Sequence, residues 1–300
     1  MREFRKYMHI ERLGREEVEG ILNGTCYVFP KIDGTNSVVW LGDDGEIHAG
    51  SRRQELALNN DNRGFMNDII KDENIKRYLV DHPNHYIYGE WLVKHSIGYY
   101  KNDAWRKFYI FDVCEDDRYL PYDEYMPVLA EYGIDNVVPL LAKFENPSEE
   151  DLTNLLKQNR FLIDDSEERF GEGVVIKNYD FVNKFGRTVF AKIVANEFLS
   201  QKGENKKPAP KDAFIETVIV NDLLTPDVIE KEYQKLINEG FSPSDNRGKF
   251  IGMFLNRMWH EFLVEEIATI DKKYRHPVLD LGRLRKELEY AVKENKKELF

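Results

Sequence analysis

The chain has 300 residues, of which 42% are hydrophobic and 13% aromatic, and its formal net charge is −11. This length predicts one large domain and a smaller one, and the apolar content is sufficient for a packed core. The acidic balance argues against a protein that coats nucleic acid by bulk electrostatics, but it does not exclude a local basic groove.

Targeting and redox signals are absent from the sequence. No apolar run approaches the roughly 18 residues of a membrane span, and the charged start of the chain lacks the apolar stretch of a signal peptide. Cys26 and Cys114 have no CxxC spacing and are expected to be buried free thiols in a reducing compartment. We therefore expect an intracellular, cytoplasmic protein that is not bound to a membrane.

The first 200 residues alternate short β-rich runs with helical stretches. Runs rich in Val, Ile, Tyr and Phe predict strands at Cys26–Pro30, Ser37–Leu41, Tyr86–Leu92, Phe108–Val113, Gly173–Lys177 and Thr188–Val194. Helices are predicted at Glu16–Leu22, Gly64–Val80, Tyr122–Tyr132 and Ser148–Gln158. Because several strands follow one another without a helix between them, the predicted class is α+β with a mainly antiparallel sheet.

Ser200–Asp212 interrupts this pattern with two prolines, a glycine and four lysines, and it is predicted to be an exposed connector. Beyond it, Thr225 followed by Pro226 is typical of a helix start. Apolar residues at helical spacing then predict helices at Val228–Ile237, Phe250–Ile267 and Leu281–Val292.

The predicted domains follow from this change of pattern. Nothing after the connector alternates with the period of two that a five-stranded barrel requires. We predict a catalytic domain at 1–203, a linker at 204–212 and a small all-helical domain at 213–300.

Residues 31–36 (KIDGTN) form the sharpest local motif and lie between two predicted strands. A lysine that leaves a strand is held rigidly, Asp33 can lie on the same side of the chain, and Gly34 permits a tight turn. Taken alone, the motif is also compatible with an ordinary β-turn that carries a surface lysine.

Further motifs follow Lys31 in a fixed order. They are Ser51-Arg52-Arg53, Tyr88-Gly89-Glu90, residues 108–112 (FYIFD), residues 172–177 (EGVVIK) and residues 190–193 (FAKI). As an ordered set they resemble those of the covalent nucleotidyltransferase superfamily, which comprises DNA ligases, RNA ligases and mRNA capping enzymes. Within it the chain resembles the RNA ligase 2 family, which has a helical C-terminal domain where the others have an OB-fold barrel.

The resemblance implies a fold and a reaction. The fold is an ATP-grasp-like ligase domain, a nucleotidyltransferase with a mainly antiparallel sheet, followed by a small all-helical domain. In the reaction, Lys31 forms a lysyl-AMP with ATP, the AMP passes to a 5′-phosphate, and a 3′-hydroxyl displaces it to seal the strand. The implied cofactors are ATP and Mg²⁺, with Mn²⁺ able to substitute. The implied partner is nicked or broken RNA, and no obligate protein partner is indicated.

The resemblance also implies roles for single residues. Lys31 is the nucleophile, and Asp33 and Asn36 complete the catalytic set. Glu172 is the expected metal ligand, since Mg²⁺ prefers carboxylate and water oxygens. The residues expected to bind the nucleotide are Lys31, Ile32, Asn36, Arg52, Glu90, Phe111 and Lys192.

Four of these nucleotide contacts have a specific chemistry. Glu90 matches the family position that holds the ribose hydroxyls. Lys192 is expected to bind the α-phosphate, and Phe111, in preference to Phe108, to stack on adenine. Arg52 is expected to contact ribose or phosphate.

Two positions depart from the family pattern. The last motif usually has a second lysine two residues after the first, but here Lys192 is followed by Val194. Lys177 or Lys184 could replace that charge, although Lys177, like Arg53, is interpreted as a surface residue. Pro30 precedes the nucleophile, where an acidic residue often contacts the adenine amino group. Base selectivity is therefore less certain than the chemistry.

Other interpretations remain open at this stage. A DNA ligase or a capping enzyme would share the lysine motif, but would normally continue into a β-barrel. A nucleic-acid-binding relative with reduced catalysis would explain the missing second lysine. His82 and His85 have the spacing of a metal-binding pair, but no third ligand stands nearby.

Overall fold

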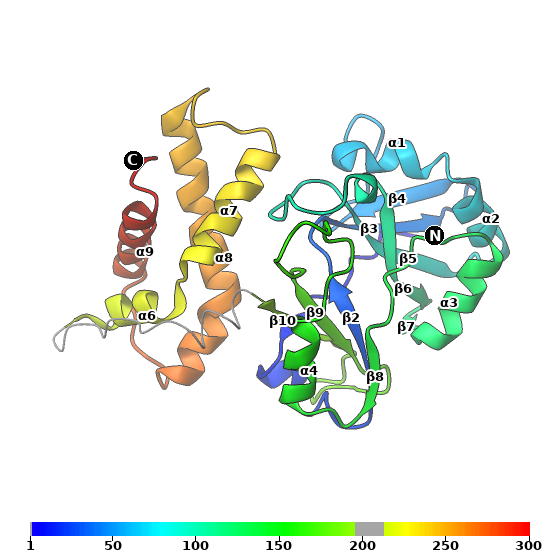
Figure 1. Ribbon diagram of the computed structural model, residues 1–300, viewed down its shortest axis with the longest axis horizontal. Coiled ribbons are helices and arrows are strands. Elements are labelled where there is room, and N and C mark those ends of the chain that lie inside the picture. Colours follow the sequence, from blue (N-terminus) through cyan, green and yellow to red (C-terminus); the bar gives the residue numbers. More distant parts are fainter. Residues whose placement is uncertain (1, 196–212) are drawn as a thin grey trace. The chain divides into compact units, whose positions relative to one another are not determined.

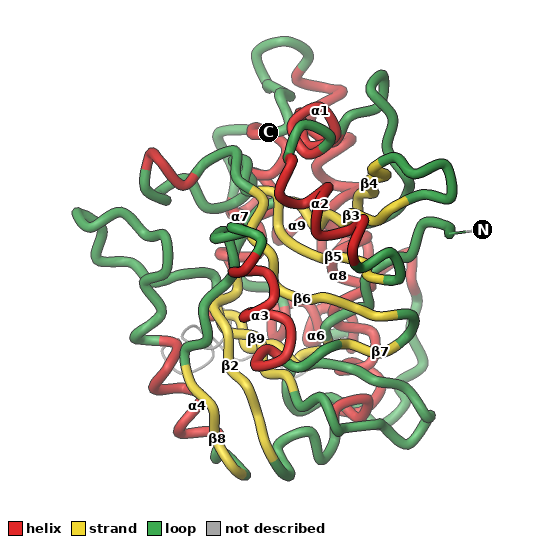
Figure 2. Tube along the Cα trace, turned by 90° about the vertical axis from the view of Figure 1, so that its right-hand side faces the viewer, coloured by secondary structure: helices red, strands yellow, loops and turns green. Residues whose placement is uncertain are grey.

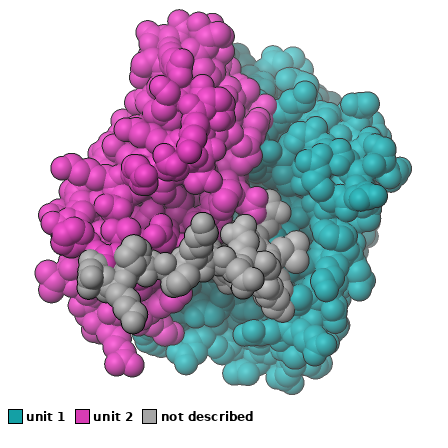
Figure 3. All heavy atoms as spheres, turned by 60° about the vertical axis from the view of Figure 1, so that its left-hand side comes forward, with its two compact units in different colours: residues 1–195 teal, residues 196–300 magenta. Residues whose placement is uncertain are grey.

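The computed structural model describes residues 2–195 and 213–300. The chain divides into two compact units, residues 1–195 and 196–300 (Figure 1, Figure 3). The predicted linker at 204–212 lies outside the described residues, so the domain boundaries at 203 and 213 stay predictions. Within the described part of the chain, the search for a helix long and apolar enough to cross a membrane found none.

Sheet A is one of two five-stranded sheets in the first unit, and its strand order is β1-β10-β9-β2-β8. The strands are β1 (Glu11–Arg12), β10 (Ala191–Val194), β9 (Gly173–Lys177), β2 (Thr25–Lys31) and β8 (Ala142–Glu145). All neighbours are antiparallel except β1 and β10, which run parallel. The sheet therefore joins the start of the unit to its end.

Sheet B has the strand order β4-β3-β5-β6-β7, and all its neighbours are antiparallel. The strands are β4 (Ile47–Ser51), β3 (Thr35–Leu41), β5 (His85–Trp91), β6 (Phe108–Glu115) and β7 (Arg118–Tyr119). The predicted α+β class with a mainly antiparallel sheet is thereby confirmed, and the sheet is divided into two.

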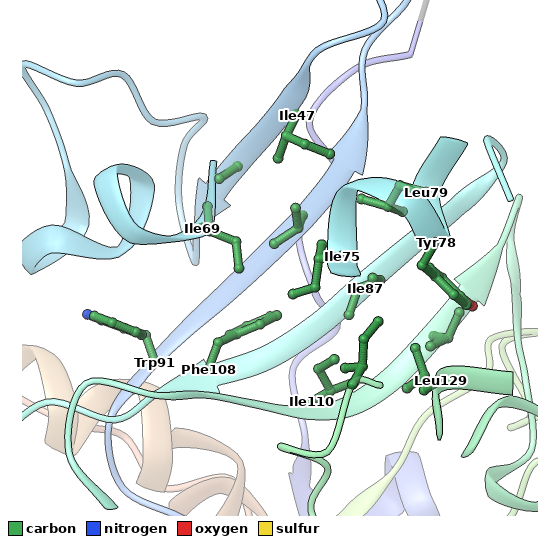
Figure 4. Packing of buried hydrophobic residues seen from close by; sticks show 14 of the residues in the cluster. Ile47, Ile69, Ile75, Tyr78, Leu79, Ile87, Trp91, Phe108, Ile110 and Leu129 are labelled. Atoms are coloured by element: carbon green, nitrogen blue, oxygen red, sulfur yellow. The ribbon is translucent and has the colours of Figure 1, made fainter. Parts of the chain in front are cut away.

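Helices cover one face of sheet B. They are α1 (Phe65–Ile69), α2 (Glu73–Asp81) and α3 (Tyr122–Glu131), whereas α4 (Glu149–Leu156) lies against β9 (Figure 2). Figure 4 shows the apolar core between these helices and the sheet, where Leu79 and Leu129 face Ile87 and Ile110. This core supports the strands that carry the motifs.

Two predicted helices are wrong in part. The stretch Gly64–Val80 is two helices, because Asp72 ends the first run and caps α2 by accepting hydrogen bonds from two backbone N–H groups. The stretch Glu16–Leu22 contains only a 3₁₀ turn at Glu16–Val18. Gly20 follows it with a φ of 86°, a left-handed conformation that interrupts a helix.

The second unit is helical, as predicted. Between residues 213 and 300 every regular element is a helix: α6 (Ile215–Leu223), α7 (Pro226–Asn238), α8 (Arg247–Lys273) and α9 (Leu281–Asn295). The hydroxyl of Thr225 caps α7 by accepting a hydrogen bond from the Val228 N–H at 3.4 Å. Phe254, Met258 and Leu288 are fully buried in the core of this unit.

Candidate active site

Lys31 is the last residue of β2, and its side chain is 23% exposed. Nζ lies 2.5 Å from Oε2 of Glu172, whose side chain is 7% exposed. Glu172 immediately precedes β9, and pairing of β9 with β2 sets Lys31 opposite Gly173. A Cβ atom at Gly173 would lie 2.1 Å from the carbonyl oxygen of Ile193, so only glycine permits this close strand packing. The ion pair is thus positioned by the sheet.

Asp33 is buried, and its carboxylate is held by the segment 95–97. Its Oδ2 accepts hydrogen bonds from the backbone N–H groups of Ser96 and Ile97, both at 2.6 Å, and from the Ser96 hydroxyl at 2.7 Å. Its Oδ1 lies 2.7 Å from Nδ1 of His95. These contacts fix the turn after the nucleophile to the segment 95–97. Asp33, which the sequence analysis placed in the catalytic set, has the contacts of a positioning residue.

Glu90 lies in β5 and faces Asn36 of β3 across the ladder. Its Oε1 accepts a hydrogen bond from the Gly34 N–H at 3.0 Å. Burial raises the pKa of Glu90 to about 8; the positive charge of Lys31 opposes this shift, and the negative charge of Glu172 adds to it. Lys31, Glu172 and Glu90 therefore form one electrostatic group, with Asn36 at its edge.

Ile32 and Phe111 lie against the hydrophobic core. Ile32 is buried in a cluster that includes Leu92 and Ile97. Phe111 lies at the point where the β5–β6 register shifts, and its ring centroid is 4.9 Å from that of Tyr7. Ile32 follows Lys31 directly in the chain, and the predicted contacts of Ile32 and Phe111 with a nucleotide stay predictions.

Arg52 follows β4 and is exposed. One of its guanidinium nitrogens, Nη2, lies 3.2 Å from Nδ1 of His9, and Nε2 of His9 lies 3.8 Å from a carboxylate oxygen of Glu11. The N-terminal segment therefore reaches a predicted nucleotide-binding residue. The sequence analysis missed this segment because it carries no recognisable motif.

Lys177 is buried, and its interpretation as a surface charge is wrong. Its Nζ donates to the carbonyl oxygen of Phe111 at 2.5 Å and to Oδ1 of Asp112 at 2.7 Å. The Tyr7 hydroxyl donates to the other oxygen of Asp112 at 2.5 Å. Burial lowers the pKa of Lys177 and raises the pKa of Asp112, and attraction between the two charges opposes both shifts. This pair lies inside the unit, whereas Arg53 is exposed as expected.

Lys192 lies in β10, opposite Val175 of β9, and is partly exposed. Val175 is in turn opposite Phe29 of β2, two residues before Lys31. Residues directly opposite one another in a sheet project from the same face, as do residues two apart along one strand. Lys192 therefore projects from the same face of sheet A as Lys31.

The described residues contain no group of three or more His, Cys, Asp or Glu side chains that could hold a metal ion by themselves. Mg²⁺ is commonly bound by one or two carboxylates together with substrate phosphates. The Glu172 carboxylate beside Lys31 fits that mode of binding. His82 and His85 stack on each other with ring centroids 4.8 Å apart, and His85 is bonded to the hydroxyl of Tyr78 at 2.7 Å.

The fold is similar to that of solved structures. An archaeal ATP-dependent RNA ligase is 17% identical, with a TM-score of 0.53, and the match covers 99% of this chain and 65% of that one. A mutant RNA ligase of Naegleria gruberi with ATP and manganese is 20% identical, with a TM-score of 0.48 and coverage of 66% and 59%. The chain thus spans about three-fifths to two-thirds of the length of these structures. No curated protein matches it.

The family model for RNA ligases matches residues 24–194, which include every predicted site residue from Lys31 to Lys192. The matched segment is more than half of the chain and begins and ends within the first unit. The chain therefore belongs to the RNA ligase family.

Proposed function

We propose that this protein is an ATP-dependent RNA ligase that joins a 3′-hydroxyl to a 5′-phosphate. The observation that carries the proposal is the Lys31–Glu172 pair at 2.5 Å, held between two strands inside the segment that the family model matches. The helical second unit adds support, because DNA ligases and capping enzymes normally continue into a β-barrel. A protein of similar fold, from an archaeon, bears the name of an ATP-dependent RNA ligase.

The first step is attack by Lys31 on ATP. The Nζ atom forms a bond to the α-phosphorus, and the bond from that phosphorus to the bridging oxygen of pyrophosphate breaks. The pyrophosphate leaves with the electron pair of that bond. A lysine must lose a proton before it can attack, and the carboxylate of Glu172, 2.5 Å away, is close enough to accept it.

The second and third steps transfer the AMP and then release it. An oxygen of the 5′-phosphate attacks the same phosphorus, the P–N bond breaks, and Lys31 is regenerated. The 3′-hydroxyl then attacks the phosphorus of the 5′-phosphate, loses its proton and expels AMP. Because the reacting groups stay anionic, positioning and positive charge supply most of the catalysis.

Glu172 would hold a divalent ion next to the phosphates. Such an ion supplies positive charge that offsets the charge of the phosphates. Glu172 is paired with Lys31 in this structure, so a cation at the carboxylate would also favour the uncharged form of the lysine.

The remaining residues would hold the nucleoside. Since the pKa of Glu90 is raised to about 8, this carboxyl is largely protonated at neutral pH and could donate a hydrogen bond to a ribose hydroxyl as well as accept one. Phe111 offers a ring for the adenine, and Arg52, which contacts His9, offers positive charge near the ribose or phosphate. Asn36 would lie near the reacting phosphate.

The substrate is tested with nicked duplexes. Purified protein would be incubated with labelled ATP, Mg²⁺ and a nick whose 3′-hydroxyl strand ends either in ribonucleotides or in DNA. We expect much faster sealing of the RNA-ended nick at low and at high salt. Recognition of the 2′-hydroxyl and of A-form geometry distinguishes RNA from DNA. Contacts with phosphates add affinity that depends on salt, but they do not make this distinction. Equal rates on both nicks at both salt concentrations would favour a DNA ligase.

We also propose that the two units divide the work. Residues 1–203 would form lysyl-AMP, and residues 213–300 would engage the RNA. A fragment ending at Gly203 should, if circular dichroism proves it folded, become labelled by ATP but seal nicks poorly. Full sealing by the fragment would contradict this division, and a folded fragment without labelling would make the helical unit part of the nucleotide site.

A further inference from the structure

ATP brings a strongly anionic triphosphate to Lys31, and the last motif lacks the second lysine that the family usually has there. Lys31 itself is paired with Glu172, and Lys177 is buried against Asp112. Lys184, the other replacement considered for the missing second lysine, contacts Glu16. A different cation on the face of Lys31 could take the place of the missing lysine.

The parallel pairing of β1 with β10 brings such a cation to the sheet. Arg12 lies directly opposite Lys192 in this ladder. The Leu13 N–H donates to the Lys192 carbonyl oxygen at 2.9 Å, and the Glu11 N–H donates to the Phe190 carbonyl oxygen at 3.0 Å. The backbone on both sides of Arg12 is thus fixed to β10 by hydrogen bonds.

The register also decides the face from which Arg12 projects. Residues opposite one another on neighbouring strands project from the same face of a sheet. Arg12 is opposite Lys192, which shares the face of Lys31. Arg12 and Lys192 therefore form a pair of cations on the face that carries the nucleophile. Val194, which is level with Lys31, adds no charge.

The N-terminal segment has further contacts with the same region. The hydroxyl of Tyr7 is bonded to Asp112, and the ring of Tyr7 packs on Phe111. His9 contacts Arg52. Tyr7 and His9 thus contact two predicted nucleotide-binding residues, Phe111 and Arg52. The segment then joins sheet A through β1, and Arg12 is its last residue.

We propose that Arg12 binds the β- and γ-phosphates of ATP and stabilises the pyrophosphate as it leaves. This inference rests on the proposed ligase function. The α-phosphate must lie at Lys31 in β2, and the strand order β2-β9-β10-β1 sets Arg12 one strand, about 5 Å, beyond Lys192. The forked guanidinium suits a phosphate with two oxygens to offer. When the α–β bond breaks, negative charge develops on the pyrophosphate, next to Arg12.

The test separates the step that uses pyrophosphate from the step that does not. Arg12→Gln, Arg12→Lys and wild type would be compared for lysyl-AMP formation across ATP concentrations, and for sealing of a strand that already carries AMP on its 5′ end. We expect Arg12→Gln to lower the efficiency of lysyl-AMP formation about tenfold or more, as for the loss of one hydrogen bond to a charged group. Arg12→Lys should recover part of it, and sealing of the pre-adenylated strand should change less than about twofold.

Arg15→Gln is the matched control. Arg15 lies three residues later, and its guanidinium pairs with Glu11 at 3.1 Å, so its loss should leave lysyl-AMP formation unchanged. Wild-type efficiency in Arg12→Gln would overturn the inference while leaving the ligase function standing. An equal loss in both assays would also overturn it, since Arg12 would then act on the fold or on the RNA. If wild type itself forms no lysyl-AMP, the proposed function fails first.

Discussion

Sheet A presents two lysine–carboxylate pairs that differ chiefly in their exposure. Lys31 and Lys177 project from the same face, and each has a carboxylate within 2.7 Å. The Lys31 side chain is 23% exposed, whereas those of Lys177 and Asp112 are 2% and 0% exposed. The first pair is open to solvent, whereas the second is closed inside the unit. Under the proposed function, one kind of ion pair would therefore serve chemistry where it is exposed and structure where it is buried.

The largest difference between the pairs should appear when each lysine is removed. Lys31→Ala should abolish lysyl-AMP formation, because it removes the nucleophile, while lowering the free energy of unfolding by only about 1 kcal/mol. Intact-mass spectrometry after incubation with ATP and Mg²⁺ is the measurement. An AMP-sized mass gain that survives in Lys31→Ala would refute the assignment.

Lys177→Met should instead destabilise the first unit by about 3–5 kcal/mol, because it leaves the Asp112 carboxylate buried without its counter-charge. Urea unfolding followed by tryptophan fluorescence would report this loss. The control is Lys177→Met combined with Asp112→Asn, which removes both charges and keeps an acceptor for the Tyr7 hydroxyl. The double variant should recover at least half of the lost stability. If it recovers none, the unpaired charge of Asp112 is not the cause of the loss.

Glu172→Gln should have an intermediate effect. It keeps the shape of the side chain but removes the charge that faces Lys31, so lysyl-AMP formation should slow and be only partly restored by more Mg²⁺ or Mn²⁺. Rates would be measured over a titration of each metal. Wild-type rates in this variant at low Mg²⁺ would count against Glu172 as a metal ligand.

The smallest expected effect concerns pH. The pKa of Glu90 is raised by burial to about 8 in the folded protein, so the folded state holds this proton more tightly than the unfolded chain does. The stability that this provides is present below the ordinary glutamate pKa and is lost as the pH rises towards 8. Glu90→Gln should therefore lower the dependence of Tm on pH between about 5 and 9. An unchanged slope would mean that Glu90 is ionised throughout.

The residues that sequence reasoning found are those whose signal is local. Lys31, Glu90 and Glu172 each lie within two residues of the end of a strand that short apolar runs predict, and the family motifs order them. Lys177 has the same kind of neighbours, but its burial depends on Asp112, which is 65 residues away in another sheet. No local pattern in the sequence predicts a contact between residues so far apart in the chain, so Lys177 was interpreted as a surface residue.

The N-terminal strand was missed for a related reason. β1 has only two residues and is defined by pairing with β10 at the far end of the unit. The split of the helix predicted at Gly64–Val80 was more accessible, because Asp72 is a typical N-cap residue. Short strands that depend on distant partners thus cannot be predicted from the local sequence, whereas helix caps can.

The strand order of sheet A also has a consequence for how the protein is made. Lys31 and Glu172 are 141 residues apart in the chain. The pairing of β1 with β10 likewise cannot form until β10 has been synthesised. At about 5–20 residues per second, the ribosome needs on the order of ten seconds to supply the second half of the ion pair after the first. During that time the nascent chain carries the nucleophile without its carboxylate, and the edge of β2 that will pair with β9 has no partner. The reactive centre is therefore among the last parts of the first unit to form, after the core of sheet B has already been synthesised.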